Sequence, residues 1–166
     1  MIPADYPYMF RILGPLDGPR KRVDADAAQA AYRHCDPRAR VDQEAYLSHF
    51  RFDESFREHL ATTGSTRNFS GATYADLIAF DIDREGDLGQ ALQDTRQLVG
   101  TLVKEYLVPP SGMLVSFSGN KGFHVEIPTR LWLGSGGPLF HRIARVFALL
   151  VADTADRTDF AIPATG

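Results

Sequence analysis

One strand-like run restricts the fold of this chain more than any other feature of its sequence. Apolar and acidic residues alternate in it, in the order Ile78, Phe80, Asp81, Ile82 and Asp83. A period of two predicts a β-strand with one buried face, because successive side chains point to opposite sides. The apolar residues then lie on the buried face, and Asp81 and Asp83 lie side by side on the other. That face must stay open to solvent or to a cation.

The elements predicted after residue 70 follow in the order β-α-β-β-α-β. Asp87 is suited to cap a long helix that Pro109-Pro110 ends. Apolar runs predict strands at 113–117, 123–127 and 158–162, and a helix at 139–152. This is the split βαβ order of ferredoxin-like and RNA-recognition-motif-like domains, in which the helices cover one face of the sheet.

The first seventy residues are predicted to form a separate lobe. Helical spacing predicts three helices in it, from Asp24 or Asp26 to His34, from Asp42 to Phe50 and from Phe52 to Leu60. We therefore expect an α+β protein, with an N-terminal, mainly helical lobe at 1–70 and an RNA-recognition-motif-like sheet at 71–166. The basic run at 19–22 fits either a solvated loop or a nucleic-acid contact.

Composition and charge exclude several classes of protein. A chain of 166 residues with 44% hydrophobic content can bury one substantial core. Its formal charge of −3 gives no bulk attraction for polyanions, so contact with nucleic acid depends on local patches or bound cations. The single Cys35 excludes an intramolecular disulfide and a cysteine-rich zinc site. No apolar stretch reaches the roughly 18 to 20 residues that span a bilayer, so we expect a cytoplasmic location and no membrane partner.

A glycine-flanked turn joins the second and third predicted strands of the sheet. It consists of Ser118, Gly119, Asn120, Lys121 and Gly122. A turn of small residues that carries a lysine and a serine is suited to hold phosphate oxygens. The strand after it buries Phe123 and Val125, which places His124 on the same open face as the two carboxylates.

The open face is predicted to gather polar side chains from separate strands. Asp81 and Asp83 repel each other unless a cation lies between them. If the last predicted strand buries its apolar residues, Asp159 becomes a third carboxylate on this face. Such a set suits one or two Mg²⁺ or Mn²⁺ ions that also bind phosphate oxygens. His124 and Lys121 are then placed to contact the phosphates.

The two motifs together resemble a known family. Asp81-Ile82-Asp83 at the end of an apolar strand, followed by Ser118-Gly119-Asn120-Lys121-Gly122-Phe123-His124, is similar to the motifs of the archaeo-eukaryotic primase superfamily. The resemblance covers about 74–162. It implies a catalytic core with an RNA-recognition-motif-like sheet, in which Asp81, Asp83 and Asp159 are the catalytic metal ligands. It also implies that the nucleotide-binding residues are Ser118, Gly119, Asn120, Lys121 and His124.

The resemblance further implies an activity and its partners. The activity is template-directed transfer of nucleotides from nucleoside triphosphates, dependent on Mg²⁺ or Mn²⁺, to make or extend primers in DNA replication or repair. The partners are a single-stranded DNA template, a primer, and a helicase or other replication protein. Related members often continue past the third aspartate with an arginine-containing segment, so we expect the native polypeptide to continue beyond Gly166.

Two other functions are considered for the same sheet. A catalytically inactive module would bind single strands by stacking bases on exposed aromatic rings. The strand aromatics Phe80, Phe123 and Phe160 are predicted to face the core instead, and an acidic face repels phosphates in the absence of metal. A metal-dependent phosphohydrolase or nuclease would use the same carboxylates with water as the nucleophile.

Overall fold

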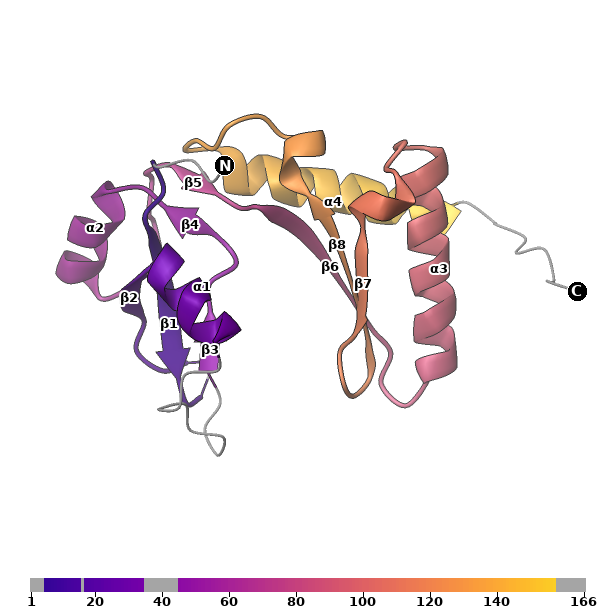
Figure 1. The fold of residues 1–166 in the computed structure, drawn as a ribbon, viewed down its shortest axis with the longest axis horizontal. Coiled ribbons are helices and arrows are strands. Elements are labelled where there is room, and N and C mark those ends of the chain that lie inside the picture. The colour runs from indigo at the N-terminus through magenta and orange to yellow at the C-terminus, as the bar shows by residue number, and fades with distance from the viewer. Residues whose placement is uncertain (1–4, 16, 35–44, 158–166) are drawn as a thin grey trace, which may run out of the picture. The chain divides into compact units, whose positions relative to one another are not determined.

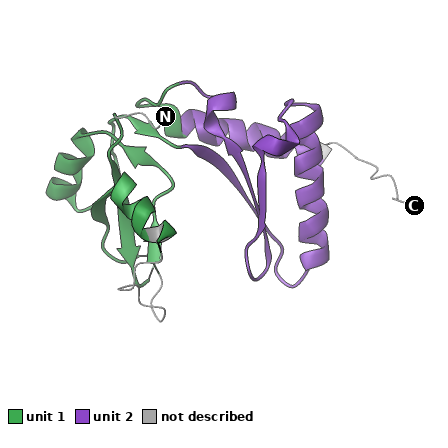
Figure 2. Cartoon of the chain, in the orientation of Figure 1, with its two compact units in different colours: residues 1–75, 135–141 green, residues 76–134, 142–166 purple. Residues whose placement is uncertain are grey.

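The structure is a computed structural model, and it describes residues 5–15, 17–34 and 45–157 (Figure 1). The chain divides into two compact units (Figure 2). The first comprises Met1–Ala75 and Ser135–His141, and the second comprises Asp76–Gly134 and Arg142–Gly166. The short segment at 135–141 comes between two parts of the second unit in the sequence but belongs to the first unit. No periodic pattern in the sequence predicts this.

The first unit is built on a five-stranded antiparallel sheet and is not the mainly helical lobe that the sequence predicts. Its strand order is β2-β1-β4-β5, and β3 pairs with β1. The elements are β1 (Tyr8–Leu13), β2 (Lys21–Asp24), α1 (Ala25–Arg33), β3 (Ala45–Leu47), β4 (Arg51–Phe52), α2 (Ser55–Thr63) and β5 (Thr73–Tyr74).

Two of the three helices predicted in this unit are confirmed, as α1 and α2. The helix predicted at 42–50 is wrong, because Ala45–Leu47 forms β3 and pairs with β1; residues 42–44 lie outside the described part. A short apolar run fits either period, and hydrogen bonding to a neighbouring strand decides between them. The basic run at 19–22 contributes the first two residues of β2, where the Arg22 guanidinium lies 4.5 Å from the centre of the Tyr8 ring.

The second unit contains a three-stranded antiparallel sheet in the order β6-β8-β7. Its elements are β6 (Leu77–Asp83), α3 (Leu88–Lys104), β7 (Leu114–Phe117), β8 (Gly122–Pro128) and, from Arg142 on, α4 (Phe140–Arg157), with short 3₁₀ turns at Pro110–Gly112 and Thr129–Leu131. Each of these strands and α-helices matches a predicted one, whereas the two 3₁₀ turns were not predicted. The strand predicted at 158–162 lies outside the described residues. Within the described part of the chain, no helix is long and apolar enough to cross a membrane.

Helix α3 begins where the sequence predicts. The Asp87 carboxylate accepts a hydrogen bond of 2.9 Å from the backbone N–H of Gln90, which satisfies one of the free donors of the first turn. The helix ends at Lys104, before the two prolines, and Leu107 turns the chain with a left-handed φ of 55°. The prolines therefore follow the end of the helix but do not set it.

We expect Asp87→Ala to lower the free energy of unfolding by about 1 kcal/mol, the usual contribution of a side-chain cap. Urea unfolding followed by circular dichroism measures this change. Glu85→Ala, at an exposed position in the same turn, is the matched control and should change stability by less than about 0.5 kcal/mol. Equal stabilities of the two variants would contradict a capping role for Asp87.

The core of the second unit lies between one face of the sheet and both helices. Its buried apolar residues come from β6, β8, α3 and α4, and are Ile78, Phe80, Val125, Ile127, Leu98, Leu102, Val151 and Ala155, together with Val108. Ile82 packs against this cluster while remaining partly exposed. Because both helices cover the same face, the predicted phases of β6 and β8 are confirmed and the opposite face of the sheet is left open.

Candidate functional site

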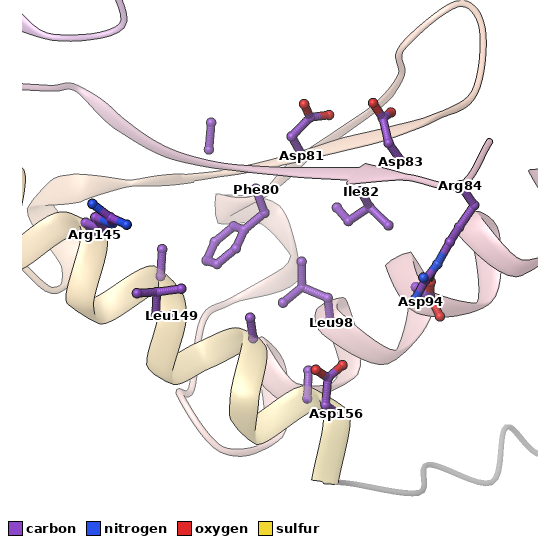
Figure 3. A pocket seen from close by; sticks show the side chains of 14 residues that line it. Phe80, Asp81, Ile82, Asp83, Arg84, Asp94, Leu98, Arg145, Leu149 and Asp156 are labelled. Atoms are coloured by element: carbon purple, nitrogen blue, oxygen red, sulfur yellow. Dashed lines mark hydrogen bonds and ion pairs between the residues drawn. The ribbon is translucent and has the colours of Figure 1, made fainter.

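Asp81 and Asp83 lie on the open face of β6, as the alternation predicts. Figure 3 shows their carboxylates on one side of the strand, whereas Phe80 and Ile82 point toward the helices on the other side. The Asp81 side chain is 69% exposed and that of Asp83 is 34% exposed. A hydrated cation can therefore reach both carboxylates without any rearrangement of the core.

His124 joins the acid pair from the neighbouring strand. The register pairs Asp81 with His124, and the histidine Nε2 lies 3.3 Å from Asp81 Oδ1. Its side chain is half exposed. The structure thus brings together the histidine and the first carboxylate that the sequence placed on one face.

Ser116 of β7 extends this row and was missed by the sequence reasoning. It pairs with His124, so Asp81, His124 and Ser116 lie on adjacent strands at the same level of the sheet. The signal was available: a tight hairpin that pairs Phe117 with Phe123 necessarily pairs the preceding serine with the following histidine. Ser116 is exposed and adds a hydroxyl to the open face.

The turn between β7 and β8 is held by hydrogen bonds at its base. The backbone N–H of Ser118 donates to Gly122 O at 2.9 Å, and the N–H of Gly122 donates to Ser118 Oγ at 3.1 Å. Gly119 has a φ of 92°, which favours glycine at this position. The Arg84 N–H donates to Lys121 O at 3.1 Å and so ties the turn to the end of β6. The predicted phosphate-binding turn therefore lies beside the acid pair.

Gly122 permits this close approach. A Cβ at position 122 would overlap the backbone oxygen of Ile82 and would lie 2.6 Å from Asp83 Oδ1. Gly122 is also directly paired with Asp83 in the sheet. Only a residue without a side chain lets the turn meet the end of β6 at this point.

Lys121 contacts the second carboxylate. Its Nζ donates to Asp83 Oδ2 at 3.0 Å, and this hydrogen bond together with the negative charge of Asp83 raises the pKa of Lys121. Each carboxylate of the pair therefore has a basic neighbour, His124 beside Asp81 and Lys121 beside Asp83. The sequence reasoning assigned Lys121 to phosphate and did not predict this ion pair.

The acid pair has the chemistry of a site for a small hard cation. Mg²⁺ prefers oxygen ligands and is commonly held by one or two carboxylates while water and substrate phosphates complete its shell. Asp81 and Asp83 fit this pattern. Within the described residues no group of three His, Cys, Asp or Glu side chains is placed to hold a metal ion. Asp159, the predicted third ligand, lies outside those residues, so its role stays a prediction.

A pocket of about 400 Å³ lies beside the edge of β6 that faces away from β8 (Figure 3). On the helix side it is lined by apolar residues of α4, among them Ala148, Leu149 and Ala152. Asp156, near the end of α4, also borders it. Within the described residues β8 is the one strand that pairs with β6, so the other edge of β6 is an outer edge of the described sheet, beside an apolar hollow.

Comparison with protein-family models, with curated proteins and with solved structures finds no match for this chain. Inference about its function therefore rests on the residues of the open face and on their geometry.

Proposed function

We propose that this protein is a primase-polymerase that makes or extends primers in DNA replication or repair. Its reaction is the template-directed, metal-dependent transfer of nucleotides from nucleoside triphosphates to a 3′-hydroxyl. The observation that carries the proposal is the grouping of Asp81, Asp83 and His124 on one face of the sheet, beside a glycine-bounded turn with a lysine. A metal site next to a phosphate-binding turn is the arrangement that nucleotidyl transfer needs.

The proposal includes a fourth strand. The order β6-β8-β7 is compatible with three strands of an RNA-recognition-motif-like sheet, in which a fourth strand would pair with the other edge of β6. We propose that 158–162 is that strand. Asp156, the residue before the last one of α4, borders the pocket at that edge. Phe160 and Ile162 would then fill the apolar hollow, and Asp159 would join the acid pair on the open face.

Each residue of the site has a role in this mechanism. Asp81, Asp83 and Asp159 would hold Mg²⁺ or Mn²⁺, which when bound would supply positive charge to activate the attacking hydroxyl and to neutralise the leaving pyrophosphate. The triphosphate lies along the turn of Ser118, Gly119, Asn120 and Lys121, and His124 donates a hydrogen bond to one of its oxygens. The primer 3′-oxygen would form a bond to the α-phosphorus as the bond from that phosphorus to the oxygen bridging to the β-phosphate breaks; pyrophosphate leaves in line, and the hydroxyl proton passes to solvent water. A single-stranded DNA template selects the nucleotide, and a helicase or other replication protein is the partner that would bring the enzyme to it.

The alternative functions differ in what they need from the open face. A base-stacking module needs aromatic rings there, whereas the face presents Leu114 and Ser116 of β7 beside the acidic and histidine side chains. A phosphohydrolase or nuclease needs only the carboxylates and water, so the product of the reaction must separate it from a polymerase.

A primer-extension assay tests the proposal. The protein is incubated with a labelled primer on a longer template, with nucleoside triphosphates and Mn²⁺ or Mg²⁺, and the products are separated by length. Extension supports the proposal, whereas release of phosphate or shortened oligomers supports the hydrolase. Glu126→Gln is a suitable control. Glu126 lies two residues after His124 on β8 and pairs with Ala79, so it does not lie opposite Asp81 in the sheet.

We expect His124→Ala to raise the KM for nucleotide by about tenfold, the effect of losing one hydrogen bond to a charged group. The affinity of the nucleotide-free protein for Mn²⁺ should change by less than about twofold, since the proposal assigns His124 to a phosphate oxygen and not to the metal. Steady-state kinetics and Mn²⁺ titration measure the two quantities. A collapse of Mn²⁺ binding in this variant would make His124 a metal ligand and contradict the assignment.

A further inference from the structure

Lys121 contacts one of the carboxylates of the proposed metal site. Its Nζ lies 3.0 Å from Asp83 Oδ2, and Asp83 is one of the two described carboxylates of the proposed metal site. An ammonium group and a divalent cation on the same carboxylate repel each other. In the metal-free protein, Lys121 therefore serves as the counter-ion of Asp83.

The side chain is free to leave while the backbone stays in place. The turn is fixed by the hydrogen bonds of Ser118 with Gly122 and by the Arg84 N–H on Lys121 O. The Lys121 side chain itself is half exposed, and its four-carbon stem is flexible. A change of partner thus requires rotation of one side chain only.

We infer that Lys121 moves from Asp83 to the triphosphate when the site is loaded, so that it couples metal binding to nucleotide binding. This inference rests on the proposed function and concerns the regulation of the same site. Without nucleotide, Lys121 competes with the metal for Asp83 and weakens metal binding. With nucleotide, the triphosphate gives the ammonium group another anion, and the competition ends. Binding of either ligand therefore favours binding of the other.

The test is the affinity for Mn²⁺ alone, measured by calorimetry or by the electron paramagnetic resonance of free Mn²⁺ at about 0.15 M salt, where distant charges are screened. We expect Lys121→Met to bind Mn²⁺ about three- to fivefold more tightly than the parent protein, because a competing exposed ion pair is removed. The same variant should bind a nonhydrolysable triphosphate more weakly. Lys121→Arg keeps the competing charge and should bind Mn²⁺ within about twofold of the parent.

Two controls separate the possible failures. Arg145→Met removes a positive charge elsewhere on the same unit and should leave Mn²⁺ affinity unchanged, so tightening in both methionine variants would overturn the specific role of Lys121. Asp81→Asn should weaken Mn²⁺ binding. If Asp81→Asn weakens Mn²⁺ binding but Lys121→Met binds Mn²⁺ as the parent does or more weakly, the proposed exchange of Lys121 between partners is wrong and the proposed metal site is retained. If Asp81→Asn has no effect, the proposed metal site itself is wrong.

Discussion

Asp81→Asn and Asp83→Asn are each expected to lower nucleotide incorporation by at least about a hundredfold. Loss of a residue that only hydrogen-bonds to a metal ligand already lowers metal affinity or activity by about 10- to 100-fold, and loss of a ligand itself should cost at least as much. Both residues lie on the open face of β6, away from the core. Replacing either carboxylate removes repulsion between two like charges, so the fold should be retained. Primer extension measures activity, and circular dichroism with thermal unfolding measures the fold.

The matched control for these variants is Glu126→Gln, a carboxylate-to-amide change on the same sheet that should leave incorporation within about twofold of the parent protein. Activity of Asp83→Asn equal to that of the parent would contradict the joint metal site. A variant that fails to fold would show that the carboxylate is needed for the structure. Asparagine has nearly the same shape as aspartate, so this substitution is chosen to disturb the packing as little as the change of charge allows.

Gly122→Ala is expected to destabilise the protein by about 1–3 kcal/mol, the cost of forcing extra atoms into a closely packed position. The added methyl would overlap the Ile82 backbone oxygen and press on Asp83. Relief of this overlap must move the turn away from β6, so we also expect weaker Mn²⁺ binding in the variant. Urea unfolding and Mn²⁺ titration measure the two effects.

Gly134→Ala provides the comparison, because no atom lies within 4 Å of the position that its Cβ would occupy. We expect this variant to change stability by less than about 0.5 kcal/mol. Equal stabilities of Gly122→Ala and Gly134→Ala would show that the turn can move away from β6 at little cost, and that close approach is not needed.

The second unit could be predicted from the sequence because its signals are long and agree with one another. Strand β6 alternates between apolar and acidic residues from Phe80 to Asp83, α3 keeps the helical period after a capping aspartate, and the apolar run of α4 exceeds what one strand can hold. Because the apolar positions of these elements all point to one core, they determine which side chains of the sheet are buried and which lie on its open face. The placement of Asp81, Asp83 and His124 on one face followed from phase alone.

The sheet of the first unit could not be predicted in the same way. Strands β4 and β5 have two residues each and β3 has three, too few to show a period. These strands form because neighbouring strands supply hydrogen-bond partners, and a short stretch of sequence does not show which strands will be neighbours. The helix predicted over β3 failed for this reason.

Within the site, the residues were predictable but one partnership was not. The contact of Lys121 with Asp83 depends on how closely the turn approaches the end of β6. That approach is set by the missing side chain of Gly122 and by the Arg84 hydrogen bond, neither of which spacing in the sequence reveals. The sequence therefore predicted which residues lie together but not which ion pair they form without ligands.

Template-directed incorporation is the most direct test of the proposed function. The protein is given a primed template whose first unpaired base is varied among the four bases, with Mn²⁺ and each nucleoside triphosphate in turn at millimolar concentration. We predict that the primer gains the complementary nucleotide, that chelation of the metal stops the reaction, and that Asp81→Asn lacks it. Release of phosphate or shortened oligomers, or an unextended primer despite Mn²⁺ bound at Asp81 and Asp83, would contradict the assignment as a primase-polymerase.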